Sequence, residues 1–124
     1  MIVGLGLGVV ETSRFRSADL RYGLRLRERI FTDGEQAYAA RKRRGYESLA
    51  VRFAAKLATA RALGLTGLPW QEVEVVRARG GAPELALHRG ADREARAQGV
   101  TGGSLSVTHD ERWCIAHVIL EGRR

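Results

Sequence analysis

The chain has 124 residues, of which 44% are hydrophobic and 28% are charged, and its formal net charge is +7. This length predicts one domain over residues 1–124, and the balance of apolar and charged residues excludes a chain that is disordered throughout. No apolar run approaches the roughly 20 residues that a membrane-spanning helix needs. Cys114 is the single cysteine, which excludes an internal disulfide and favours a reducing compartment. We therefore expect a cytoplasmic protein with no membrane partner, whose basic surface attracts phosphates, nucleic acid or an acidic protein.

The first predicted element is a strand over residues 2–10. Gly4, Gly6 and Gly8 alternate with larger apolar residues, so the three glycines share one face of this strand. Glycines on one face favour tight packing of a helix against the strand, and a ligand lying against the same face is the alternative interpretation.

A basic helix is predicted to follow this strand. Ser17 is a suitable N-cap for a helix that reaches Ile30. Arg21, Arg25 and Arg29 recur at four-residue spacing, which places them in one stripe along such a helix.

Two further helices have recognisable ends. Thr32 and Glu35 have the spacing of a capping box, which predicts a helix that starts at residue 33. The clearest helix covers residues 46–63 and ends where Gly64 can act as its C-terminal cap.

The second half of the chain is predicted to be mainly β. Residues 72–88 read as a hairpin with its turn at residues 80–83, residues 91–98 as a short helix, and residues 104–109 and 113–120 as strands. The predicted class is therefore α+β, with a mainly antiparallel sheet packed against the long helix.

A cluster of basic residues is the main candidate site. Its members are Arg43, Arg44, Arg52, Lys56 and His109. Guanidinium groups match phosphate oxygens in geometry, an ammonium supplies a mobile point charge, and an imidazole can bind a phosphate or move a proton. A solvated charged face, ion pairs with nearby glutamates, and a histidine that caps a turn are the alternatives that the pattern leaves open.

The residue spacing gives little support to metal or nucleophilic chemistry. Cys114 and the three histidines lack zinc-ligand spacing, and the carboxylates form no short motif. Ser106, His109 and Asp110 could form a triad, but neighbours along one strand and turn seldom have the required geometry.

Four segments together resemble one known family. They read GLGLGVVE at 4–11 (followed by Arg14-Phe15), RFAAKLA at 52–58, GAP at 81–83 and LSVTHD at 105–110. In this order, and over essentially the whole chain, they are similar to motifs of the holo-acyl-carrier-protein synthases, which are small trimeric 4′-phosphopantetheinyl transferases. The resemblance implies the 4′-phosphopantetheinyl transferase fold and a homotrimer with sites between neighbouring subunits.

The resemblance also implies ligands and partners. Coenzyme A or phosphopantetheine would be the ligand, and its phosphates would be held by basic residues before and within the long helix. These residues are Arg43, Arg44, Arg52 and Lys56, with His109 nearby. The partner would be an acyl carrier protein, whose acidic recognition helix would meet the basic first helix. That role falls on Arg14, Arg21 and Arg25.

Two positions depart from the family pattern in a way that concerns magnesium. The family's strand aspartate is Gly8 here, and its glutamate after Lys56 is Leu57. In the family those two carboxylates hold the magnesium that bridges the coenzyme A pyrophosphate. Magnesium requires oxygen ligands, which neither residue offers in its side chain, so we expect no required cofactor and no magnesium site here. Gly8→Asp with Leu57→Glu is accordingly expected to restore some transfer.

These departures favour a repurposed member of the family. The expected function is to bind a carrier protein, or the acyl or polyketide chain on its phosphopantetheine arm, and to catalyse a metal-independent cyclisation, dehydration or isomerisation in secondary metabolism. His109, Asp110 and Glu11 are the available acid–base residues. A genuine holo-acyl-carrier-protein synthase and a non-catalytic, carrier-binding subunit or decoy are the alternatives. Nucleic-acid binding is least favoured, because few aromatic side chains are free to stack on bases.

Overall fold

The computed structural model describes residues 1–67, 70–77 and 81–123 of the chain. Its helices are α1 (Thr12–Tyr22), α2 (Leu24–Ile30), α3 (Asp33–Ala40), α4 (Gly45–Leu63) and α5 (Arg89–Ala97), with a 3₁₀ turn at Trp70–Glu72. Its strands are β1 (Ile2–Glu11), β2 (Val73–Arg77), β3 (Pro83–Leu87), β4 (Val100–His109) and β5 (Trp113–Gly122). The predicted α+β class and the order of strands and long helix are confirmed.

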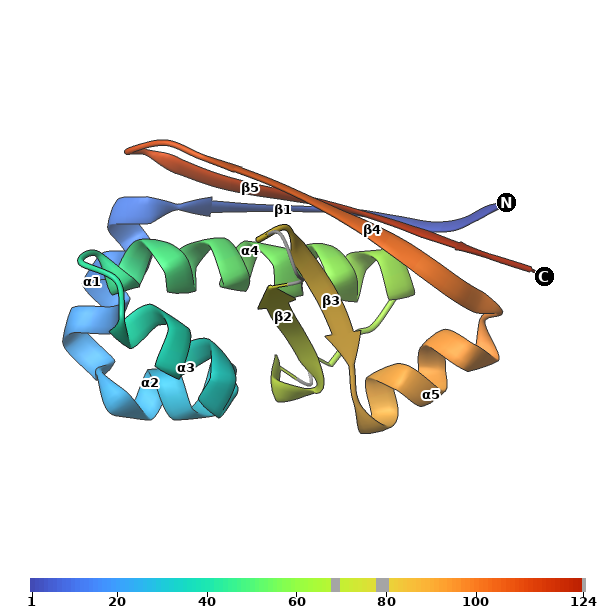
Figure 1. Ribbon diagram of the computed structural model, residues 1–124, viewed down its shortest axis with the longest axis horizontal. Coiled ribbons are helices and arrows are strands. Elements are labelled where there is room, and N and C mark those ends of the chain that lie inside the picture. The colour runs from blue at the N-terminus through green and yellow to red at the C-terminus, as the bar shows by residue number, and fades with distance from the viewer. Residues whose placement is uncertain (68–69, 78–80, 124) are drawn as a thin grey trace.

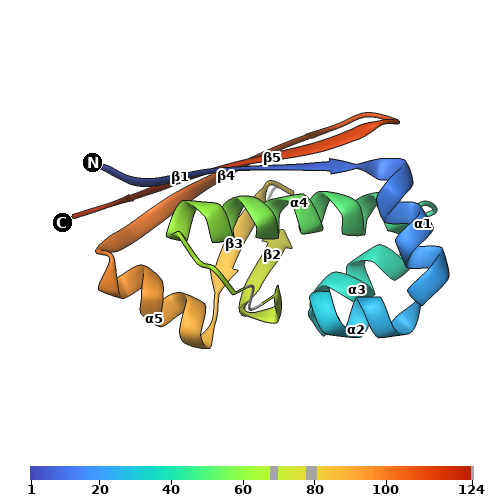
Figure 2. The ribbon, with the colours of Figure 1, turned by 180° about the vertical axis from the view of Figure 1, so that it is seen from behind.

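Helix α4 lies between two β structures. Strands β1, β5 and β4 form an antiparallel sheet in that order, and β2 pairs with β3 in a separate antiparallel hairpin. The three-stranded sheet covers one side of α4, while the hairpin and α3 lie on the other side (Figure 1). Helices α1, α2 and α3 gather at one end of the molecule and α5 lies toward the other end, as the reverse view also shows (Figure 2). Within the described ranges, no helix is both long enough and apolar enough to cross a bilayer.

The glycine face of β1 packs directly on the backbone of α4. A Cβ atom on Gly4, Gly6 or Gly8 would lie 2.4, 1.8 or 2.0 Å from a carbonyl oxygen of α4. Those oxygens belong to Ala62, Ala58 and Ala54 respectively. Tight packing of a helix is therefore the correct interpretation of the glycine pattern. We call this contact the glycine seam.

The basic segment after β1 forms two helices where one was predicted. Helix α1 begins at Thr12, directly after the strand, where the Thr12 N–H donates to the Arg112 carbonyl (2.9 Å). It ends at Gly23, whose φ of +55° interrupts the helix before α2 begins. Arg21 consequently lies on α1 while Arg25 lies on α2, so the prediction of a single basic stripe is wrong.

The predicted ends of α3 and α4 are confirmed. The Glu35 N–H donates to Thr32 Oγ1 (3.2 Å), and the Thr32 N–H donates to Glu35 Oε1 (3.0 Å), which completes the capping box. Gly64 adopts the left-handed conformation (φ +68°) after α4. The predicted hairpin is also present, although residue 80 of its expected turn lies outside the described residues.

The outer face of the three-stranded sheet is apolar and exposed over β1 and the start of β5. Leu5, Leu7 and Val9 project from β1 on the side away from α4, and Trp113 and Ile115 project from β5 beside them. The inner face of the same strands is buried on α4 and contributes to the core. The sheet is therefore apolar on its inner face and on the β1 part of its outer face, and the inner face is the one packed against α4.

Candidate functional site

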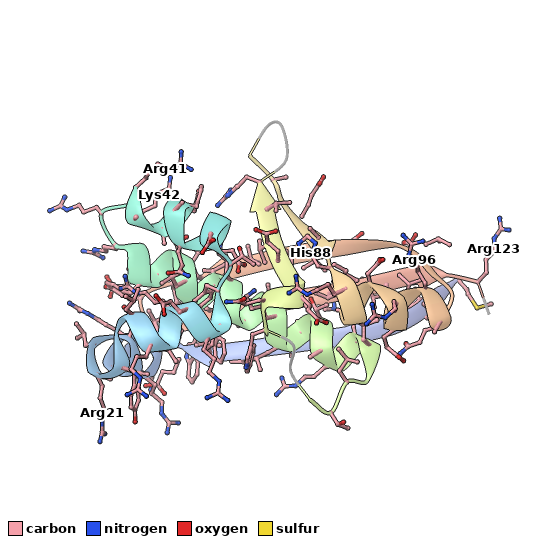
Figure 3. The ribbon with its side chains drawn as sticks, turned by 90° about the horizontal axis from the view of Figure 1, so that it is seen from below. Arg21, Arg41, Lys42, His88, Arg96 and Arg123 are labelled. Atoms are coloured by element: carbon pink, nitrogen blue, oxygen red, sulfur yellow. The ribbon has the colours of Figure 1, made fainter. Side chains whose placement is uncertain are left out.

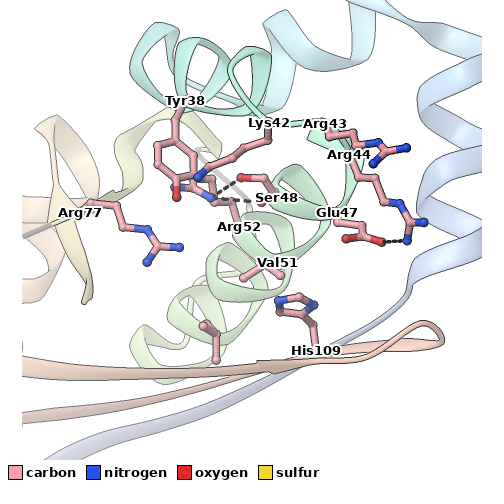
Figure 4. A pocket seen from close by; sticks show the side chains of 11 residues that line it. Tyr38, Lys42, Arg43, Arg44, Glu47, Ser48, Val51, Arg52, Arg77 and His109 are labelled. Carbon is pink, nitrogen blue, oxygen red and sulfur yellow. Dashed lines mark hydrogen bonds and ion pairs between the residues drawn. The ribbon is translucent and has the colours of Figure 1, made fainter. Parts of the chain in front are cut away.

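A pocket of about 440 Å³ lies where the α3–α4 connection and the start of α4 meet β2 and the end of β4. Its lining is strongly basic. The lining residues are Tyr38, Lys42, Arg43, Arg44, Glu47, Ser48, Val51, Arg52, Arg77, Val107 and His109. We call this the cationic pocket (Figure 4).

Arg52 is the buried cation of this pocket. Its side chain is only 4% exposed, and its Nη1 donates to Ser48 Oγ (2.6 Å), one turn earlier on α4. Its Nε is buried and has no hydrogen-bond partner among the described residues. Burial is the main cause that lowers the pKa of this guanidinium. A buried donor without a partner is costly, so an anion in the pocket would stabilise this arrangement.

Tyr38 organises the cations around it. The guanidinium carbons of Arg52 and Arg77 lie 4.3 and 5.3 Å from the centre of its ring, and Lys42 Nζ lies 4.9 Å from it. Burial acts to raise the pKa of the Tyr38 hydroxyl, but the neighbouring cations outweigh it and hold the pKa below its usual value. The ring therefore holds cations from the α3–α4 connection, α4 and β2 in one group.

Four of the five residues predicted to bind phosphate line this pocket. Arg43 and Arg44 are exposed at its rim, and Arg44 Nη1 lies 3.4 Å from Glu47 Oε1. His109 approaches from the end of β4 and faces α4 (Figure 4). With Arg52, these residues form one site, although they come from two distant parts of the sequence: the start of α4 with the loop before it, and the end of β4.

Lys56, the fifth predicted residue, lies elsewhere. Its side chain is 1% exposed, and its Nζ lies 2.8 Å from Glu35 Oε1. The same ammonium donates to the backbone carbonyls of Trp70 (2.8 Å) and Val73. Burial is the main cause that lowers the pKa of Lys56, and the nearby Glu35 opposes that effect. In this arrangement Lys56 joins α4 to α3 and β2 and does not line the cationic pocket.

The three predicted acid–base residues are not brought together. His109 lines the cationic pocket, whereas Asp110 Oδ1 accepts hydrogen bonds from the N–H groups of Arg112 (2.8 Å) and Trp113 (2.7 Å). These bonds hold the pKa of Asp110 below its usual value and fix the β4–β5 turn. Glu11 accepts from Ser13 Oγ (2.9 Å) and lines a different hollow.

The arginines expected to meet a carrier protein are exposed on the helical end. Arg14 and Arg21 lie on α1 and Arg25 lies on α2. Arg27 clamps the two helices together, because it forms a two-pronged ion pair with the buried Asp19 (both contacts 2.7 Å). Figure 3 shows Arg21 on the edge of this end opposite to Lys42, which lines the cationic pocket.

The two positions expected to hold a metal in the resembled family do not fit one here. Gly8 has no side chain, and the Ala54 carbonyl of the glycine seam fills the space that a side chain would need. Leu57 faces a largely apolar hollow of about 270 Å³. In the described part of the chain, no three His, Cys, Asp or Glu side chains lie close enough together to hold a metal ion. The donor set therefore differs from the oxygen-rich shell that magnesium prefers.

Sequence and structure comparisons agree on one family. Residues 4–117 match the family model of the 4′-phosphopantetheinyl transferase superfamily. A holo-[acyl-carrier-protein] synthase of Solibacter usitatus is 44% identical, with 98% of this chain and 99% of that protein covered. The crystal structure of the synthase from Neisseria meningitidis superposes with a TM-score of 0.90 at 28% identity, covering 98% of this chain and 99% of that one. The synthase from Bacillus anthracis, solved in complex with coenzyme A (3′,5′-ADP), gives 0.79 at 30% identity and 99% coverage of both chains.

These matches correct the functional prediction made from the sequence. A second relative, from Streptomyces griseus, is 41% identical and fully covered, and it too is a holo-[acyl-carrier-protein] synthase. The interpretation as a repurposed enzyme of secondary metabolism with altered chemistry, or as a pseudoenzyme, is therefore wrong. That interpretation gave the substitutions at Gly8 and Leu57 more weight than the similarity of the rest of the chain to the holo-acyl-carrier-protein synthases. By sequence over its whole length, and by fold, the chain belongs to the holo-acyl-carrier-protein synthase family of the 4′-phosphopantetheinyl transferases.

Proposed function

We propose that this protein transfers 4′-phosphopantetheine from coenzyme A to a serine of an acyl carrier protein. The observation that carries the proposal is the cationic pocket, which gathers Arg43, Arg44, Arg52 and His109 around one cavity. A relative 30% identical to this chain was solved with coenzyme A (3′,5′-ADP) bound. Arginine and histidine N–H donors are well suited to phosphate oxygens, so the nucleotide phosphates are assigned to this pocket.

The reaction forms one bond and breaks one. The carrier serine Oγ bonds to the phosphorus that bears the pantetheine arm, and the bond from that phosphorus to the bridging pyrophosphate oxygen breaks. The leaving group is 3′,5′-adenosine bisphosphate, and the serine proton passes to a base or to solvent. Fixed cations stabilise the charge that develops on the leaving phosphate, and the imidazole of His109 can act as the general base that accepts the serine proton.

The acidic carrier protein is assigned to the basic helical end. Arg14, Arg21 and Arg25 are exposed there on α1 and α2. Their positive charge would attract an acidic helix and orient it before the serine reaches the pocket.

Transfer is tested by intact-protein mass spectrometry. An apo carrier protein incubated with this protein, coenzyme A and magnesium should gain the mass of one phosphopantetheine, and 3′,5′-adenosine bisphosphate should appear in equal amount. A carrier protein whose modified serine is replaced by alanine is the matched control and should gain nothing. No gain in the first carrier, while another synthase modifies it under the same conditions, would contradict the proposal.

The exposed apolar sheet face supports a homotrimer. Large apolar side chains are gathered there from β1 and β5, and a patch of this kind marks an interaction surface. We expect light scattering to give three times the mass of one chain, and Leu7→Lys to dissociate the assembly because it places a charge in the interface. Leu20→Lys, which changes a leucine on α1 that is even more exposed (76% against 50% for Leu7), is the control and should leave the mass unchanged. A monomeric wild-type protein at tens of micromolar concentration would refute the assignment of this face.

A further inference from the structure

The cationic pocket carries a large excess of positive charge. Five arginine and lysine side chains line it, and one carboxylate, Glu47, opposes them. That carboxylate is already paired with Arg44. The pocket therefore offers about four uncompensated positive charges. A phosphate monoester carries between about −1.5 and −2 near neutral pH, so the excess is of the size that a nucleotide with several phosphates would neutralise.

Two of these cations, the buried Arg52 and the exposed Arg77, contact the same aromatic ring. Arg52 is buried, anchored to Ser48 and stacked on the Tyr38 ring, while its Nε stays unpartnered in the described structure. Arg77 reaches the same ring from β2 (Figure 4), and its Nη1 donates to the Gly81 carbonyl. A guanidinium fixed by an aromatic face loses little conformational freedom when it binds an anion.

The place where the family holds its divalent ion is lined here mainly by hydrocarbon and backbone, and the charged residues beside it are Glu11 and Arg14. The glycine seam brings the Ala54 carbonyl to 2.0 Å from where a Gly8 Cβ would lie, and Leu57 shares its hollow with other apolar side chains such as Phe53 and Ile30. A strongly basic pocket and a metal position lined by a single carboxylate, Glu11, therefore occur in the same molecule.

We propose that this chain balances the phosphate charge of coenzyme A with fixed side-chain cations, principally Arg52 and Arg77 held by Tyr38, and holds no divalent ion between β1 and α4. The inference rests on the proposed function, because it takes coenzyme A as the ligand. It adds Arg77 and Tyr38 to the ligand-binding residues and makes the binding of the nucleotide independent of magnesium.

Calorimetric titration with 3′,5′-adenosine bisphosphate and with coenzyme A tests this directly. Each ligand is titrated into the wild-type protein in excess magnesium and again in EDTA. The dissociation constants should agree within about twofold. Binding that weakens tenfold or more in EDTA would overturn the inference. Tight binding of Mn²⁺ by the protein–coenzyme A complex would also overturn it. Electron paramagnetic resonance would detect such binding as a loss of the free Mn²⁺ signal larger than the loss that coenzyme A alone causes.

Variants identify the cations that act. Arg77→Ala should weaken binding of both ligands about tenfold or more, the usual scale for loss of a charged hydrogen bond. Tyr38→Leu should weaken it as well, because both guanidiniums lose their stacking surface, while Tyr38→Phe keeps the ring and should retain most of the affinity. Arg93→Ala removes an exposed arginine on α5, outside the pocket, and serves as the matched control. Unchanged affinity in Arg77→Ala and Tyr38→Leu would overturn the assignment.

The outcomes separate the inference from the function on which it rests. If the carrier protein is modified but the nucleotide binds only with magnesium, the transferase proposal stands and this inference fails. If neither ligand binds under any condition, both fail.

Discussion

Gly8→Asp, which would restore the carboxylate that related enzymes carry on this strand, is expected to destabilise the protein by about 3 kcal/mol or more. The new Cβ would lie 2.0 Å from the Ala54 carbonyl oxygen and 3.0 Å from the Ala58 nitrogen, both backbone atoms of a buried helix. Neither atom can move without displacing α4 from the sheet, and overpacking of this kind is costly. The added carboxylate would also lie in the buried glycine seam, and burying a charge is costly.

Thermal unfolding followed by circular dichroism measures this effect. At about 4 °C for each kcal/mol, the melting temperature should fall by about 12 °C or more. Gly102→Ala is the matched control, because it adds a Cβ to another strand glycine where nothing lies within 4 Å, and it should change the melting temperature little. A Gly8→Asp protein as stable as wild type would show that the glycine seam is looser than described.

The same geometry corrects the expectation that Gly8→Asp with Leu57→Glu restores transfer. Leu57 is partly exposed and lines a hollow, so its change to glutamate alone should be tolerated far better than the change at Gly8. The double variant is expected to fail because it does not fold stably, whatever its capacity to bind a metal.

Lys56→Met is expected to lower the free energy of unfolding by about 3–5 kcal/mol, the range for breaking a buried ion pair. It would leave the Glu35 carboxylate buried beside α4 without its cation, and would leave two buried carbonyls of the 3₁₀ turn and β2 without a donor. Glu35 would still accept from the N–H groups of Thr32 (3.0 Å) and Val75 (3.1 Å), but these bonds do not neutralise its charge.

Urea denaturation measures the loss, and the chain offers a matched control in its other lysine. Lys42→Met removes the same group from an exposed position and should change the free energy of unfolding by less than about 1 kcal/mol. Glu35→Gln combined with Lys56→Met should recover part of the loss, because no buried charge is then left uncompensated. A single variant within about 1 kcal/mol of wild type would mean that this ion pair contributes little.

Local patterns in the sequence predicted much of the fold. The capping box at Thr32, the cap at Gly64 and the alternation of glycines in β1 each depend on neighbours within a few residues, and each was confirmed. The break at Gly23 was missed because a lone glycine in a basic helical stretch is compatible with one continuous helix as well as with two.

The site was harder to predict because its partners lie far apart in the chain. Arg52 and Lys56 are both positively charged and lie four residues apart on α4. Arg52 lines the cationic pocket, whereas Lys56 is buried against Glu35. The four-residue offset rotates Lys56 toward β2, and its pairing with Glu35 depends on how α3 packs. Arg77 and Tyr38 carried no local signal, since a strand arginine and a helical tyrosine are ordinary in those elements until the structure brings them together.

The order of strands in the sheet has a consequence for how the chain reaches its native state. Strand β5 lies in the middle, between β1 and β4, although it is the last strand in the sequence. Strand β1 pairs with it across more than a hundred residues, from Glu11 opposite Trp113 to Ile2 opposite Glu121. Pairings of such high contact order form slowly. During synthesis on the ribosome, the leucines and valines of β1 therefore lack their neighbouring strand until nearly the whole chain has been made. This strand is the segment most in need of a chaperone at that stage.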